Sequence, residues 1–314
     1  MLRCWLALIL LAFAKLSSGQ DPHDRDYNLS VDVELVQLPV SVLDKNGTPI
    51  RGLQQAHFSV YEDKVEQEIS LFKQEDIPLS VGLVIDGSGS MSDKLDRLNA
   101  AALTFVRESN PDDETSIVSF ADEAILEQDF TKDTRELGQA LTGIAANGNT
   151  ALYDAVLLAA RHLNQHGSHE KKVLLVVSDG DDNKSKYKLE DALKALQESK
   201  IMLYSIGLLD SDAIYTYSSN GGGKKALKKL AEATGGASFF PKNVNQVEEI
   251  CQRIARDLRN QYTVGYKPSN GKLDGSWRKI QVRVNPPKTI SKIKVRTKQG
   301  YYAPVSHGTR EAMR

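Results

Sequence analysis

Strands and helices alternate along the central part of this 314-residue chain, and this alternation limits the possible folds more than any other feature. Leu79 to Ile85 and Val173 to Val177 are continuous apolar runs, which is typical of strands buried on both faces of a sheet. Apolar residues at helical spacing follow the first run, beginning with Leu95 and Leu98. The pattern repeats, and it predicts an α/β domain over residues 78–260 with a doubly wound, mostly parallel sheet.

The regions on either side of this domain have the two-residue periodicity of strands. Apolar residues recur at every second position from Val36 to Val42 and again from Ile280 to Val284. Each region alone is too short for a stable sandwich, because a few strands cannot bury enough apolar surface. We therefore expect residues 20–77 and 261–304 to pair as one discontinuous, immunoglobulin-like β-sandwich, followed by a tail at 305–314.

Residues 1–19 have the features of a cleavable secretory signal. Arg3 precedes the apolar run from Cys4 to Ala14, and small residues follow up to Gly19. This run is shorter than the about 20 residues that span a bilayer, and no later apolar run reaches that length. The sequence predicts a secreted chain, periplasmic or extracellular, without a transmembrane segment after cleavage. A buried N-terminal helix and an uncleaved anchor are the alternatives.

Cysteine and charge content constrain stability and binding. Cleavage of the signal removes Cys4 and leaves Cys251 alone, so no intramolecular disulfide is expected. Removal of Arg3 and Lys15 with the signal leaves 38 of the 40 basic residues against 41 acidic residues, a net charge of −3, which argues against a general binder of polyanions such as nucleic acid.

The segment Val84 to Asp93, VIDGSGSMSD, places oxygen-bearing side chains directly after the first buried strand. Ligands of open α/β sheets bind at the carboxyl ends of the strands, where this segment lies. It lacks the spacing of a phosphate-binding loop, and it lacks the elbow and the nearby histidine of a serine hydrolase. Asp86, Ser88 and Ser90 instead offer oxygen ligands of the kind that hard divalent cations prefer.

Two further segments complete a resemblance to the von Willebrand factor type A (VWFA) domain. DGSGS at residues 86–90 resembles that family's D-x-S-x-S signature. Thr150 stands in GNTAL before a helix, and Asp179 stands in SDG after the second buried strand. The resemblance covers about residues 78–259 and implies a metal-ion-dependent adhesion site (MIDAS) that holds Mg²⁺ or Mn²⁺.

The resemblance also implies a role for each site residue. The two serines and the threonine would coordinate the metal through hydroxyl oxygens, and the two aspartates would act mainly through coordinated waters. An Asp or Glu carboxylate of a protein partner would take the open position. The flanking strands and the closing KQGYYAP resemble the secreted VWFA-related proteins common in Acidobacteria, which implies an exported setting. The implied metal-site residues are Asp86, Ser88, Ser90, Thr150 and Asp179.

Structural roles are the alternative for these residues and the preferred interpretation for several other groups. The hydroxyls could cap helices, and the aspartates could cap strand ends. Asp181 and Asp182 are interpreted as an acidic rim, with a second cation site as the alternative. His162, His166 and His169 are interpreted as surface residues rather than a zinc site.

Two longer runs are also interpreted as structural. Val244 to Leu258 carries an apolar helical stripe that is expected to face the core, with Cys251 as an inert buried thiol. Residues 277–298 are rich in lysine and arginine without an acidic residue, and they predict a solvated strand face. A site for an anionic partner is the alternative for this basic run.

These observations predict a non-enzymatic binding or adhesion protein that captures a protein ligand through a metal-bridged carboxylate. A divalent-metal hydrolase or phosphoryl-transfer enzyme using the same loops is one alternative. It would need a general base or a nucleophile beside the metal, and the sequence offers none there. A structural module in which the metal only stabilises the fold is the other alternative.

Overall fold

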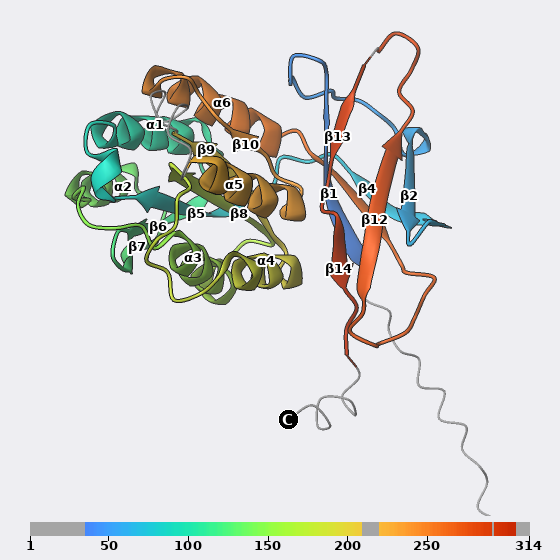
Figure 1. The fold of residues 1–314 in the computed structure, drawn as a ribbon. Coiled ribbons are helices and arrows are strands. Elements are labelled where there is room, and N and C mark those ends of the chain that lie inside the picture. The colour runs from blue at the N-terminus through green and yellow to red at the C-terminus, as the bar shows by residue number, and fades with distance from the viewer. Residues whose placement is uncertain (1–34, 209–219, 291, 306–314) are drawn as a thin grey trace, which may run out of the picture. The chain divides into compact units, whose positions relative to one another are not determined.

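The computed structural model describes residues 35–208, 220–290 and 292–305, all of which fall within one compact unit (Figure 1). The predicted signal at residues 1–19 lies outside this part of the chain. Within it, no helix combines the length and apolarity that crossing a membrane requires.

A six-stranded sheet forms the centre of the α/β region. Its strands are β5 (Leu79–Asp86), β6 (Glu114–Phe120), β7 (Ala124–Thr131), β8 (Lys171–Ser178), β9 (Ile201–Gly207) and β10 (Ser238–Phe239). Their order is β10-β9-β8-β5-β6-β7, and every neighbouring pair is parallel except β6 with β7. The predicted α/β architecture with a mostly parallel sheet is confirmed.

Helices cover both faces of this sheet (Figure 1). Successive strand residues point to opposite faces, so Leu83 and Ile85 belong to one core cluster while Val84 belongs to the other. One face is packed by α1 (Leu95–Glu108), α2 (Thr134–Gly143) and α6 (Val247–Leu258). The other face is packed by α3 (Leu152–His166), α4 (Leu189–Glu198) and α5 (Asn220–Thr234).

The last helix packs as the apolar stripe predicts. A 3-10 turn at Val244–Gln246 leads into α6, whose residues Val247, Ile254 and Leu258 are buried in the first core cluster. Cys251 lies in the same cluster as a free thiol. Burial raises the pKa of this thiol to about 12, so it is protonated and unreactive at neutral pH.

Two four-stranded antiparallel sheets are built from both ends of the described chain. One has the order β13-β1-β11-β4, from β13 (Lys294–Arg296), β1 (Val36–Leu43), β11 (Tyr262–Tyr266) and β4 (Ile69–Lys73). The other has the order β14-β12-β2-β3, from β14 (Gly300–Tyr302), β12 (Trp277–Val284), β2 (Phe58–Glu62) and β3 (Val65–Gln67). Both sheets contribute to one hydrophobic core, in which Leu38, Val60, Tyr262 and Val282 lie.

The chain leaves and re-enters these sheets on neighbouring strands. The α/β region is inserted between β4 and β11, which pair antiparallel with Lys73 opposite Thr263. Backbone hydrogen bonds therefore join the two strands that flank the insertion.

The basic run is a solvated strand face only in part. Lys279 and Arg283 on β12 are exposed, as predicted. Arg278 is 3% exposed, and its guanidinium pairs with Asp274 at 3.1 Å, so the prediction is wrong at this position. The two-residue period of a strand explains the difference, because Arg278 shares a face with the buried Ile280.

Arg296 also departs from the predicted solvated face. Its guanidinium forms an ion pair with Asp257 of α6, and Asp257 accepts a further hydrogen bond of 2.6 Å from the Tyr204 hydroxyl. Gln261 donates to both Tyr204 (3.2 Å) and the Ser41 hydroxyl (3.1 Å). These polar contacts join the α/β region to the sheet that contains β1 and β13.

Candidate metal site

Two of the three predicted site loops leave adjacent strands at the same edge of the sheet. β5 ends at Asp86 and β8 ends at Ser178, and these strands pair in parallel with Ile85 opposite Val177. Their carboxyl ends therefore meet, which brings the segment after Asp86 next to Asp179.

A chain of hydrogen bonds links the side chains of these two loops. The hydroxyl oxygens of Ser88 and Ser90 are 3.1 Å apart, and the Ser90 hydroxyl donates to Asp179 Oδ2 at 2.8 Å. The Ser88 amide donates to Asp86 Oδ1 at 2.9 Å. Four of the five predicted residues are thus connected in one cluster of oxygen atoms.

Asp86 lies at the buried base of this cluster. It is 0% exposed, and its Oδ2 accepts a hydrogen bond of 2.5 Å from the Ser178 hydroxyl. Burial raises the pKa of Asp86 to about 6, and the nearby charge of Asp179 adds to the increase, although hydrogen bonds from Ser178 and Ser88 oppose it. A negative charge at this position is therefore costly unless a cation lies close to it.

Thr150 is brought to the same edge by contacts between the second loop and its neighbours. The Asn147 amide donates to Gly87 O (2.8 Å), and the Gly89 amide donates to Gly148 O (3.2 Å). These bonds hold the second loop against the segment that carries Ser88 and Ser90. Thr150 is 5% exposed.

The third loop also contacts Thr150. Its backbone amide donates to Asn183 Oδ1 at 2.9 Å, and its carbonyl accepts from the amides of Asn183 and Lys184. Thr150 is therefore fixed between the loops that follow β5 and β8.

The hydroxyl groups of the site do not cap helices. Ser88 precedes the 3-10 turn Gly89–Met91 but makes no side-chain capping bond. The residue at the N-cap of α3 is Ala151 rather than Thr150, and the residue at the N-cap of α1 is Lys94. The capping alternative thus fails for these hydroxyls, although Asp86 does accept the bond from the Ser88 amide.

Burial changes from the base of the site to its rim. Asp86, Ser88 and Thr150 are buried, whereas Asp179 is half-buried and Ser90 is exposed. The oxygen atoms of the rim are thus open to solvent, while those of the base are held by protein contacts.

This donor set fits a hard divalent cation. Such ions take oxygen ligands, and the site offers three hydroxyls and two carboxylates from three loops. Within the described residues, no cluster of three or more His, Cys, Asp or Glu side chains is placed to hold a metal. The site has only two carboxylates, so its fit to a cation depends on its hydroxyls.

Three further residues position the site and were not singled out from the sequence. The Ser178 hydroxyl donates to Asp86 and also accepts from the Gly180 amide at 2.9 Å, so it joins the first and third loops. Asn183 holds the Thr150 amide. Asp122 accepts from the Asn149 amide and its side-chain nitrogen, at 3.2 and 2.7 Å.

Signals for these residues are weak in the sequence. Ser178 could have been noticed because it is polar at the end of an apolar strand beside Asp179. The roles of Asn183 and Asp122 depend on contacts between loops that are distant in the chain.

Asp182, His162 and His169, which were considered as ligands of further metal sites, form hydrogen bonds with other residues. Asp182 Oδ2 accepts from the Tyr153 amide (3.0 Å) and the Ser185 hydroxyl (2.5 Å), so it holds the start of α3. His162 bonds to Asp129 at 2.9 Å, whereas His169 bonds to the carbonyl of Asp112 at 3.0 Å. Within the described residues these histidines form no metal cluster.

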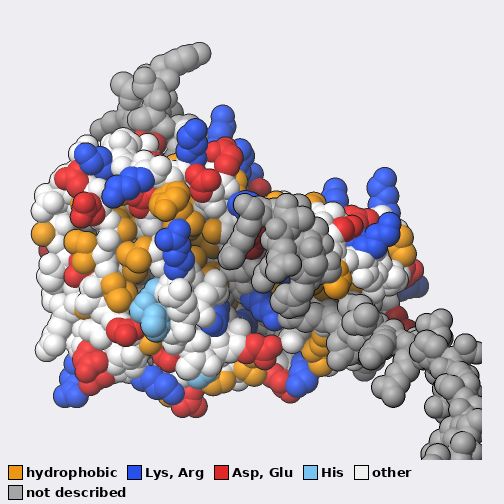
Figure 2. Space-filling model, turned by 90° about the horizontal axis from the view of Figure 1, so that it is seen from below, with side chains coloured by type: hydrophobic (Ala, Val, Ile, Leu, Met, Phe, Trp, Pro, Cys, Tyr) orange, Lys and Arg blue, Asp and Glu red, His pale blue; other side chains and the backbone are white. Residues whose placement is uncertain are grey.

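Figure 2 shows acidic and basic side chains interspersed on the face that it presents.

Comparisons with known proteins agree with this fold. Residues 81–181 match the family model of the von Willebrand factor type A domain, so the chain contains such a domain. Inter-alpha-trypsin inhibitor heavy chain H4 of Bos taurus is 25% identical over 213 residues, which are 62% of this chain and 22% of that protein. The matched region thus spans less than a quarter of that relative's length.

Two solved structures illustrate the likeness. A von Willebrand factor type A structure from Catenulispora acidiphila has a TM-score of 0.50 at 13% identity and covers 90% of this chain and 77% of that chain. It shows a shared fold. The vWF domain of the type V pili tip protein Mfa5 from Porphyromonas gingivalis has a TM-score of 0.46 at 16% identity, covering 57% of this chain and 95% of that chain.

Proposed function

We propose that this chain is a secreted, non-enzymatic binding protein that captures a carboxylate of a protein ligand at a Mg²⁺ or Mn²⁺ site. The observation that carries the proposal is the oxygen cluster at the ends of β5 and β8, whose hydroxyls cap no helix and whose rim is open. The match to a type A domain over residues 81–181 supports it.

The five residues of the site would have different roles in holding the cation and admitting the ligand. Ser88, Ser90 and Thr150 would supply hydroxyl oxygens, while Asp86 and Asp179 would hold the serines and the coordinated waters. When bound, the cation would supply a positive centre that attracts an Asp or Glu carboxylate of the partner. Ser90 and Asp179 would line the entry of that carboxylate, because they are the members of the set that reach solvent.

A metal-dependent hydrolase is less consistent with the described residues. Catalysis would need a general base or a nucleophile beside the metal. The histidines with hydrogen bonds in the described part contact Gln54, Asp129 and Asp112, none of which belongs to the site. The two carboxylates of the site are already bonded to its serines.

The flanking sheets and the N-terminus complete the proposal. The two antiparallel sheets would form one discontinuous immunoglobulin-like sandwich that carries the type A domain, and residues 1–19 would direct export before they are removed. These features would place the metal site outside the cytoplasm, where Mg²⁺ and protein partners are both available.

The test compares metal binding and protein capture in matched variants. Titration calorimetry with Mg²⁺ and Mn²⁺ is expected to give binding to the wild type and a loss of at least tenfold in Ser88→Ala and Asp179→Ala. Ser92→Ala is the control, because Ser92 is an exposed serine of the same segment outside the cluster. Capture from an exported proteome should need Mg²⁺ and be lost in EDTA and in the two site variants.

Three results would contradict the proposal. Equal metal affinity in Ser88→Ala and Ser92→Ala would show that Ser88 does not contribute to a metal site. Capture that survives EDTA would favour a structural role for the metal. Metal-dependent phosphatase or esterase turnover that is lost in Asp86→Ala would favour an enzyme.

A further inference from the structure

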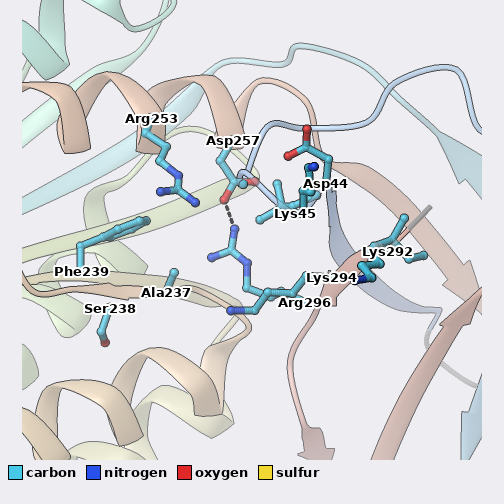
Figure 3. Close-up of a pocket in the computed structure, with 13 residues that line it drawn as sticks. Asp44, Lys45, Ala237, Ser238, Phe239, Arg253, Asp257, Lys292, Lys294 and Arg296 are labelled. Atoms are coloured by element: carbon cyan, nitrogen blue, oxygen red, sulfur yellow. Dashed lines mark hydrogen bonds and ion pairs between the residues drawn. The ribbon is translucent and has the colours of Figure 1, made fainter. Parts of the chain in front are cut away.

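A pocket lined by cationic residues lies far along the chain from the metal-site loops. This pocket of about 480 Å³ is bounded by the turn after β1, strand β10, helix α6 and the segment that ends in β13 (Figure 3). Its volume is within the range of small-molecule sites, roughly 300–1,000 Å³. Five of its lining residues are cationic: Lys45, Arg253, Lys292, Lys294 and Arg296.

The two acidic residues of this pocket, Asp44 and Asp257, neutralise only one of its five cations. Asp257 is engaged by Arg296 and by the Tyr204 hydroxyl. Asp44 Oδ1 accepts from the amides of Asn46 and Thr48, both at 2.8 Å, so it stabilises its own turn. The remaining four cations face the pocket without a matching acidic residue, in a chain whose overall charge is only −1.

Arg253 has the clearest position for holding a ligand. It projects from α6 into the pocket, with its guanidinium carbon 5.4 Å from the centre of the Phe239 ring (Figure 3). A ring at this distance orients the guanidinium by a cation–π contact. Among the described residues, none forms a hydrogen bond or an ion pair with this guanidinium. Its five N–H donors are therefore available to a carboxylate or a phosphate.

The turn after β1 leaves space for this guanidinium. Gly47 has a φ of +81°, and a Cβ at this position would overlap the Arg253 side chain. Glycine suits the positive φ of this position, and its missing side chain leaves the space that the Arg253 guanidinium occupies. The turn also brings Lys45 to the edge of the pocket.

We propose that this pocket binds a small, multiply charged oxyanion, with Arg253 as the main contact and Lys45, Lys292 and Lys294 as supporting charges. The shared chemistry of the ligand is two or more phosphate or carboxylate groups within a molecule that fits the hollow. Apolar wall residues, among them Phe239 and Ile293, would contact the uncharged part of the ligand. The pocket shares no lining residue with the candidate metal site, and the proposed binding needs no divalent metal.

Pyrophosphate and citrate are suitable probes, because they distinguish phosphate from carboxylate recognition at a similar charge. We expect one or both to bind the purified full chain by titration calorimetry in buffer stripped of divalent metal with a chelating resin, with an affinity that falls as NaCl is raised. Arg253→Gln should weaken binding about tenfold, because it removes the main contact and its N–H donors. Lys294→Gln should weaken binding about threefold, because it removes one exposed supporting charge.

Arg256→Gln is the matched control, because Arg256 is an exposed arginine of the same helix outside the pocket. Its affinity for the probes should stay within about twofold of wild type. Circular dichroism and thermal melting should confirm that all three variants fold. Absence of binding by both probes would overturn the proposal, as would an equal loss in Arg253→Gln and Arg256→Gln. Binding of an acidic peptide without binding of either small anion would overturn it as well.

Discussion

Asp86 and Asp257 are both almost fully buried, at 0% and 4% exposure, yet the groups that surround them differ in charge. Asp257 has an internal cation, because Arg296 forms an ion pair with it. Among the described residues, Asp86 accepts hydrogen bonds from neutral donors, the Ser178 hydroxyl and the Ser88 amide, and the nearby charge of Asp179 is negative. The chain itself thus supplies the positive partner of Asp257, whereas the described residues supply none to Asp86, where an external cation would take that role.

Breaking the Asp257 pair should have the largest effect on stability. Asp257→Ala leaves the Arg296 guanidinium partly buried without its partner, and we expect the free energy of unfolding to fall by about 3–5 kcal/mol. The double variant Asp257→Leu with Arg296→Met should lose much less, because apolar residues can replace a buried pair. Denaturant titration measures both. Equal losses in the single and double variants would show that the pair is not the source of the effect.

Adding Mg²⁺ should reveal a difference in stability between variants of Asp86 and variants of Asp257. At a Mg²⁺ concentration of about 100 times its Kd, the free energy of unfolding should rise by about 2.7 kcal/mol through preferential binding to the folded chain. Asp86→Asn should lose this gain, whereas Asp257→Asn should retain it even though it starts from lower stability. Thermal and denaturant unfolding with Mg²⁺ and with EDTA provide the measurement. A full gain in Asp86→Asn would mean that Mg²⁺ acts elsewhere.

Lys171, whose ammonium feels the charge of Asp257, should give the smallest effect on stability. Burial lowers the pKa of its ammonium to about 8, although the charge of Asp257 opposes the decrease, and its Nζ donates to Leu258 O at 2.5 Å. Between pH 8 and 10.5 the unfolded chain keeps a proton that the folded chain has lost. The free energy of unfolding should therefore rise with pH across this interval, by on the order of 2 kcal/mol.

Lys171→Met is the control for this pH dependence. The variant should lack the rise, which denaturant titrations at pH 8 and pH 10 can detect as a difference from wild type. An identical rise in both proteins would assign the effect to another group.

The central fold and the approach of two candidate-site loops could be predicted from the sequence because both depend on local patterns. The continuous apolar runs of β5 and β8 indicate strands that are buried on both faces, and they end at Asp86 and Ser178. The carboxyl ends of neighbouring parallel strands meet, so the loops that carry Ser88, Ser90 and Asp179 could be expected to converge.

The remaining features depend on which distant segments pack together. Asn183 and Asp122 act through loops that no local pattern connects. Arg278 could have been assigned to the buried face from its two-residue spacing to Ile280, but its neutralisation by Asp274 requires the turn before β12. Arg296 is close to Asp257 only because β13 pairs with β1 beside the end of α6.

The insertion of the α/β region between β4 and β11 has a consequence for the modularity of the chain. Lys73 and Thr263 are paired residues of antiparallel strands, so their Cα atoms are separated by only about 4.5–5.5 Å. The whole α/β region thus occupies the position of a hairpin loop. A short turn could replace it without moving either strand, and a different domain with adjacent termini could be exchanged into the same position. Such an exchange would also have to accommodate Arg296, whose partner Asp257 belongs to the segment removed.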